Sequence, residues 1–130
     1  MSDFEAIRQN IDAVEEAYEF MLAYAAQGRV EEGAGPEGAH IRNFLERFVD
    51  AVEGLTTQVA ALVGKDQEAG AALLAGFEQD SATVMSVLRI LLARDNISSE
   101  MVDNTNGLIA MRSYLTTLFF IDKVVMVDGK

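Results

Sequence analysis

The chain has 130 residues, of which 21 are acidic and 10 are Lys or Arg, so its formal net charge is −11. This length predicts one domain, residues 1–130, with a core that needs no disulfides, and the sequence contains no Cys. The acidic balance argues against nucleic acid and anionic membranes as partners. No apolar run approaches the roughly 20 residues of a membrane span, and the first residues are acidic where a signal peptide is basic. We therefore expect a soluble, cytoplasmic protein.

Apolar residues at alternating steps of three and four predict two long helices, over residues 3–27 and 36–63. The first stripe is Phe4, Ile7, Ile11, Val14, Tyr18, Met21 and Ala25. The second stripe is Ile41, Leu45, Phe48, Val52, Leu55, Val59 and Leu62. Gly28 is expected to end the first helix, and Pro36 to open the second, because its missing N–H is not needed there.

A wider apolar stripe predicts a third helix over residues 67–94, and Ser98 is the expected N-cap of a fourth helix over 99–126. Residues 103–107, with the sequence Asp-Asn-Thr-Asn-Gly, also have the composition of a turn. We expect a continuous fourth helix, and the alternative is a short helix, a break and then a long helix. Short links make neighbouring helices antiparallel, so the predicted fold is an all-α, up-down-up-down four-helix bundle.

The end of the fourth predicted helix is apolar on nearly all sides, whereas a bundle helix needs only one apolar stripe. We expect Leu118 and Phe119 to serve the core. The predicted outward-facing residues are Phe120, Val124 and Val127, with Phe20 of the first helix as a related surplus. Exposed apolar clusters mark interfaces. Because symmetric dimers are the commonest assembly, we expect a homodimer, or else a site for another protein. The alternative is that the C-terminal tail covers the patch.

A second group of residues converges on the end of the bundle that carries the Gly-rich loop, residues 28–38. This group of candidate ligand-binding residues is Tyr24, His40, Glu100, Asn104 and Asn106. Polar side chains beside a capped apolar cavity suit a small-molecule site. The alternative to an interaction protein is therefore a ligand- or metal-binding bundle, or an enzyme that acts on a small phosphorylated molecule.

Clustered carboxylates are the sequence feature behind that enzymatic alternative. Glu15, Glu16 and Glu19, followed by Glu100 and Asp103, resemble the Mg²⁺-binding motifs of all-α nucleotide pyrophosphohydrolases, because cations that bridge phosphates need such acids. That family spaces its motifs more closely, and the first three acids here project away from the core stripe. The pattern is typical of a solvated acidic face. With one His and no second Glu-x-x-His, we expect no metal site, no cofactor and no catalytic residue.

Asp80 and Arg112 flank the stripes of the third and fourth predicted helices at about the same level of the bundle. Such positions form ion pairs that set helix orientation in coiled coils, so we predict a structural ion pair. The leading functional hypothesis is a small acidic regulator, adaptor or chaperone that acts through protein–protein contact without catalysis.

Overall fold

The computed structural model describes residues 3–33, 36–64 and 67–126, and only the backbone of residues 3, 36–39 and 67. Every regular element in these ranges is helical, as predicted. The elements are α1 (Asp3–Ala26), α2 (Pro36–Val63), α3 (Gln67–Leu92), α4 (Ser99–Asn106), α5 (Ile109–Phe120) and the π-helical turn η1 (Ile121–Val125). None of the described helices is long and apolar enough to cross a membrane.

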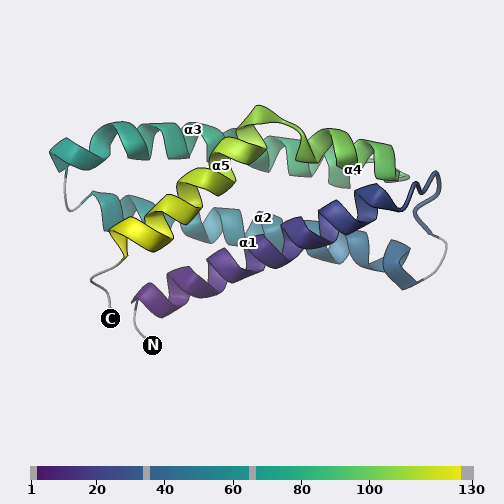
Figure 1. Ribbon diagram of the computed structural model, residues 1–130, viewed down its shortest axis with the longest axis horizontal. Helices are drawn as coiled ribbons and strands as arrows, with labels where there is room; N and C mark the ends of the chain where they lie inside the picture. The colour runs from purple at the N-terminus through teal and green to yellow at the C-terminus, as the bar shows by residue number, and fades with distance from the viewer. Residues whose placement is uncertain (1–2, 34–35, 65–66, 127–130) are drawn as a thin grey trace.

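The three long helices begin and end close to the predicted boundaries. α1 ends before Gly28, which has a φ of +66° that favours glycine over residues with a Cβ, and α2 begins at Pro36. Successive long helices run in opposite directions along the long axis of the molecule (Figure 1). α1 packs against α2 and α4, whereas α3 packs against α2 and α5.

The predicted apolar stripes form the core. In α1, Ile7, Ile11, Val14 and Met21 are buried, and the other members of the stripe lie partly buried beside them. All of the α2 stripe is buried except Leu62, which is partly buried. Burial of one face of each helix is the main favourable contribution to a fold of this kind, because the hydrophobic effect scales with the apolar area removed from water.

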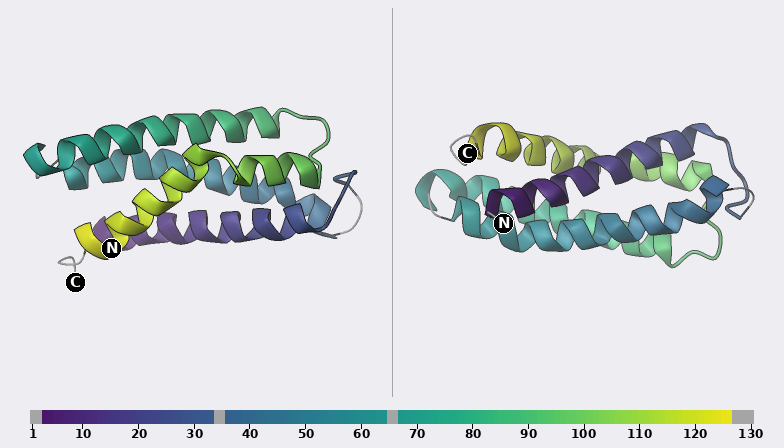
Figure 2. Two further views of the ribbon diagram at one scale, coloured as in Figure 1. Left: turned by 45° about the horizontal axis from the view of Figure 1, so that its top comes forward. Right: turned by 90° about the horizontal axis from the view of Figure 1, so that it is seen from below.

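The prediction of a continuous fourth helix over residues 99–126 is wrong, and so is the count of four helices. α4 ends at Asn106, and Leu108 has an extended backbone, with φ −64° and ψ 138°, before α5 begins at Ile109. Figure 2 shows the chain changing direction between α4 and α5. The predicted N-cap is confirmed, since Ser98 accepts a hydrogen bond from the backbone N–H of Met101.

The break allows the two halves of this region to follow different neighbours. α4 lies on α1 and buries Val102, whereas α5 lies on α3, where the Tyr114 ring stacks on Phe77 with ring centroids 5.2 Å apart. A straight helix presents its apolar stripe to one side only. The direction must therefore change, and the turn chemistry of residues 103–107 marks where it does.

The last described turn is wound as a π-helix. The backbone N–H of Met126 donates to the carbonyl of Ile121, five residues earlier, at 3.0 Å. Both side chains are buried. The wider turn thus keeps an apolar residue on the core side at each end of η1.

Candidate functional sites

The five residues predicted to bind a ligand lie in different parts of the structure. Tyr24 is fully buried, and its hydroxyl donates to the Ile97 carbonyl at 2.6 Å. His40 and Glu100 are exposed. Asn104 and Asn106 line one hollow at the junction of α4 and α5. The five residues therefore do not form one site, because the first lies inside the bundle and the last two lie at the helix break.

Tyr24 belongs to a polar cluster that joins two loops of the chain. The Ser99 hydroxyl donates to the Tyr24 carbonyl at 2.7 Å and accepts from the Arg29 N–H, also at 2.7 Å. The Ser99 N–H in turn donates to the Arg29 carbonyl at 2.9 Å. Burial raises the pKa of the Tyr24 hydroxyl, which keeps it protonated as a donor. These bonds fix the loop after α1 to the start of α4.

An ion pair completes this cluster. Arg42 of α2 binds both carboxylate oxygens of Glu32, at 2.6 and 2.9 Å, and also donates to the carbonyls of Leu92 and Arg94. Glu32 accepts from the Ile97 N–H at 2.9 Å. The hydrogen bonds from Arg42 hold the pKa of the Glu32 carboxyl below its ordinary value. We call the set Tyr24, Glu32, Arg42, Asn96 and Ser99 the loop latch.

The loop latch is a structural device, because its polar groups satisfy one another. Asn96 accepts from the Glu32 N–H at 2.9 Å and donates to the Val30 carbonyl at 2.8 Å. The sequence analysis did not identify Glu32, Arg42 or Asn96. In the sequence Glu32 is one of four charged residues of the Gly-rich loop, and nothing there singles it out as the partner of Arg42.

The hollow at the helix break, named here the α4–α5 hollow, has a volume of about 560 Å³. It is lined by Tyr18, Leu22, Asp103, Asn104, Asn106, Gly107, Leu108 and Arg112. Asn106 is only 6% exposed; its amide nitrogen donates to the Met21 carbonyl at 3.2 Å. Its Oδ1 atom is buried and has no hydrogen-bond partner. A buried acceptor in this state costs free energy unless a donor reaches it.

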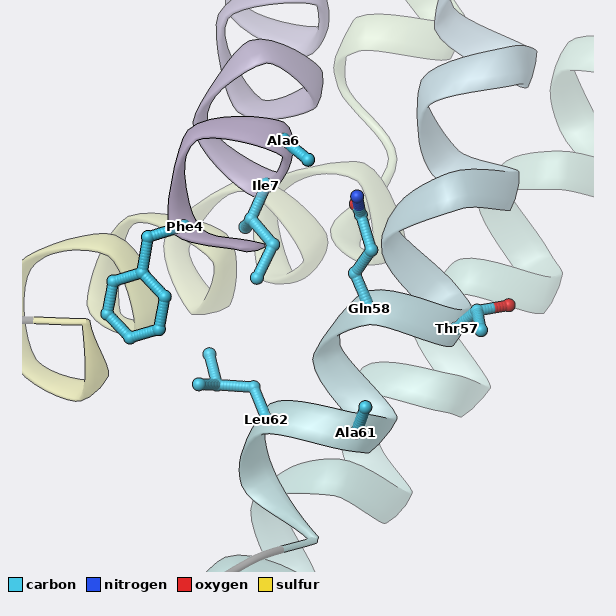
Figure 3. A pocket seen from close by; sticks show the side chains of 7 residues that line it. All are labelled: Phe4, Ala6, Ile7, Thr57, Gln58, Ala61 and Leu62. Carbon is cyan, nitrogen blue, oxygen red and sulfur yellow. The ribbon is translucent and has the colours of Figure 1, made fainter. Parts of the chain in front are cut away.

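A second hollow of about 260 Å³ opens between the start of α1 and the end of α2 and is named here the α1–α2 hollow. Figure 3 shows Phe4 and Ile7 of α1 facing Leu62 of α2, with the Gln58 amide directed toward α1. None of its lining residues is titratable. This recess can receive an apolar group, but it offers no acid, base or nucleophile.

The carboxylates singled out in the sequence do not come together. Glu15, Glu16 and Glu19 are exposed on α1, and Glu100 and Asp103 are exposed on α4. Among the residues that the structure describes, no group of three or more His, Asp or Glu side chains could hold a metal ion.

The predicted interface residues have three different outcomes. Phe120 and Val124 are exposed, by 47% and 53%. Phe20 is not part of that surface, because its ring stacks on Phe44 of α2 at a centroid distance of 4.3 Å and lies against the core. Val127 lies outside the described residues. Phe119, expected in the core, is 39% exposed because α5 turns it outward beside Phe120.

We call the outward residues Phe119, Phe120 and Val124 the α5 apolar face. The segment from Ile109 to Met126 that carries it has a single carboxylate, Asp122, in a chain of 21 acidic residues. Asp122 is 19% exposed and pairs with Lys123 at 3.4 Å and with Arg8 of α1 at 3.8 Å. The α5 apolar face is thus an apolar area with no exposed acid of its own segment beside it.

The predicted ion pair between Asp80 and Arg112 is not formed. Asp80 accepts a hydrogen bond from the Ser113 hydroxyl at 2.6 Å, one residue further along the chain. Arg112 lines the α4–α5 hollow instead. The prediction placed the partner of Asp80 one residue too early, at position 112. The helix break changes which side chain of α5 faces α3.

Comparisons of this protein with protein-family models, with curated proteins and with solved structures found no match. What the surfaces can bind is therefore inferred from their own chemistry.

Proposed function

We propose that this protein acts through protein–protein contact and that it forms a homodimer through the α5 apolar face. The observation that carries the proposal is the exposure of Phe119 and Phe120 at the end of α5 and of Val124 one turn later. Apolar side chains gathered in this way are buried when a partner covers them, and each contributes free energy in proportion to the area removed from water.

The local charge of this segment permits a second copy as the occupant. Two chains that each carry a net charge of −11 repel each other over most of their surfaces. The segment from Ile109 to Met126 has one carboxylate, which is paired, and two cations, Arg112 and Lys123. A contact made by this segment therefore brings few acids of the segment itself together. Closed twofold dimers are also the commonest assemblies of soluble proteins.

The surroundings of the face add an apolar recess at the same end of the molecule. The ion pair between Arg8 and Asp122 places η1 beside the first turns of α1. The Arg8 guanidinium also lies over the Phe4 ring, 5.9 Å from its centroid, and Phe4 lines the α1–α2 hollow. Figure 1 shows the end of α5 and the start of α1 at one end of the molecule. An interface here has both protruding rings and a hollow.

The test is the molar mass in solution, measured by light scattering during size-exclusion chromatography over a range of concentrations. The wild type should have the mass of two 14.2 kDa chains, and Phe120→Asp and Val124→Asp should reduce it to one, because a charge at the centre of an apolar contact is desolvated without a partner. Ile90→Asp is the matched control, since Ile90 is 61% exposed on α3, away from this face. A wild type that stays monomeric at every concentration would exclude the homodimer. Dissociation by the control variant would place the interface elsewhere.

A further inference from the structure

The α5 apolar face is too small to hold a dimer together by itself. Phe119 is 39% exposed and Phe120 is 47% exposed. Because a fully buried aromatic side chain removes roughly 150–250 Å² from water, the two rings present on the order of 200 Å². Stable interfaces bury about 800 Å² of each partner. A homodimer that uses this face must therefore cover neighbouring surface as well.

The α1–α2 hollow is an apolar recess beside this face. Arg8 connects the two, because it pairs with Asp122 of η1 at 3.8 Å and lies over the Phe4 ring, which lines the hollow. Ile7 and Leu62 add apolar walls, as Figure 3 shows. Since none of the lining residues is titratable, an apolar group that enters the hollow leaves no charge buried without a partner.

The size of the hollow suits one aromatic ring. Its volume is about 260 Å³, and an apolar cavity of about 150 Å³ is already large enough for benzene. Among the described residues, the exposed Phe and Tyr rings are those of Phe119 and Phe120. Neither ring lines the hollow of its own chain. An occupant taken from this protein therefore comes from a second copy.

We propose that the Phe120 ring of each copy inserts into the α1–α2 hollow of the other copy. This inference rests on the proposed homodimer and adds the site that receives the ring. In a twofold dimer the contact is formed twice, because what one copy presents to the second the second presents to the first. The reciprocal contact buries Phe4 and Leu62 together with the α5 apolar face, which supplies the additional area that the face lacks.

The experiment replaces Phe120 by p-benzoylphenylalanine, a photoreactive aromatic residue that attaches to C–H groups within its reach. The irradiated full chain should give a product of twice 14.2 kDa. Mass spectrometry of its digest should locate the attachment at residues 4–7 or 57–62 of the other copy. The same photoreactive residue at Ile109, which is 84% exposed at the other end of α5, is the control and should give no such product.

The attachment site separates this inference from the proposed function. Attachment to residues 116–124 of the other copy would overturn the ring-in-hollow contact and leave the homodimer standing. A chain that stays monomeric at every concentration and gives no product would overturn both. A wild-type mass that rises beyond two chains would also overturn the reciprocal contact, because rings inserted in one direction only build an open series of copies.

Ala61→Trp tests the hollow without changing α5. Ala61 lines the hollow and is exposed, so the larger side chain fills the recess from outside the core, and the thermal midpoint should stay within a few degrees of the wild type. The dissociation constant of the dimer should rise by about tenfold to a hundredfold, because the ring is displaced at two places. Ala93→Trp, at an exposed position just after α3, is the matched control and should leave it unchanged. An unchanged or lower constant in a folded Ala61→Trp would overturn the inference.

Discussion

Two buried tyrosines mark regions of this protein that solve the same problem differently. Tyr24 and Tyr114 are both fully buried. In the loop latch, the Tyr24 hydroxyl donates to the Ile97 carbonyl at 2.6 Å. Between α3 and α5, the Tyr114 hydroxyl has no partner within the described residues, and burial raises its pKa strongly.

The contrast shows that a buried polar group supports the fold only when its partner is in place. A buried hydroxyl that donates to a carbonyl recovers what it loses on leaving water, whereas one without a partner does not. The loop latch satisfies its groups from within the chain. The region from the end of α4 into α5 leaves two such groups, the Asn106 oxygen and the Tyr114 hydroxyl, without a partner among the described residues. We expect mutations to stabilise or destabilise the protein according to this difference.

The largest effect is expected for Arg42→Gln. The substitution removes the guanidinium that binds Glu32 and the carbonyls of Leu92 and Arg94, so the free energy of unfolding should fall by about 2 kcal/mol, as for lost hydrogen bonds to a charged group. Urea denaturation followed by circular dichroism measures it. Arg89→Gln is the control, because Arg89 and its partner Glu53 are more than half exposed. The control should cost less than about 0.5 kcal/mol, and an equal loss in both variants would contradict the role of the loop latch.

Tyr24→Phe should destabilise the protein by about 1.5 kcal/mol, because the Ile97 carbonyl loses its buried donor. The same denaturation experiment measures the change. Tyr18→Phe is the matched control on the same helix, since Tyr18 is only partly buried and should change stability little. If the two substitutions had the same effect, the hydrogen bond to Ile97 would contribute nothing.

Tyr114→Phe should act in the opposite direction. It removes a buried hydroxyl that has no partner and keeps the ring that stacks on Phe77, so stability should rise by up to about 1 kcal/mol. The thermal midpoint and the urea midpoint should both increase. A loss of stability would show that a bound water or a ligand satisfies this hydroxyl in solution.

The smallest effect is expected from pH. Because the pKa of Glu32 is lowered in the folded protein from an ordinary value of 4.5, the unfolded chain takes up this proton more readily than the folded one. The stabilisation is therefore complete above about pH 4.5 and is lost as the pH falls through the lower pKa of the folded state. Denaturation at a series of acidic pH values should show Glu32→Gln losing its disadvantage relative to the wild type. A constant difference at every pH would contradict the assignment.

The sequence was most informative where local rules decide the outcome. The steps of three and four identified the buried faces of α1 and α2, Gly28 and Pro36 placed their ends, and Ser98 placed the start of α4. Each of these signals depends on a residue and its neighbours within one or two turns, where backbone geometry and capping act. The outward placement of Phe120 and Val124 followed from the same reasoning, as an apolar surplus beyond one stripe.

Contacts between distant segments were not predictable in this way. The pairing of Glu32 with Arg42 and with the Ile97 N–H depends on how two loops meet, and nothing in either loop specifies the other. Asp80 accepts a hydrogen bond from the Ser113 hydroxyl and does not pair with Arg112, because the helix break changes the register of α5 against α3. Phe20 turned inward because Phe44 of α2 lies beside it.

The sequence by itself thus determined that the chain is helical, which faces are buried and where most helices end, because these follow from periodicity and local backbone chemistry. The tertiary structure decided whether the turn signal at residues 103–107 or the continuing apolar stripe prevails. The chain turns there, because α4 packs on α1 and α5 packs on α3. That choice leaves the Asn106 oxygen without a donor and brings Arg112 to the same hollow, and it turns Phe119 and Phe120 outward.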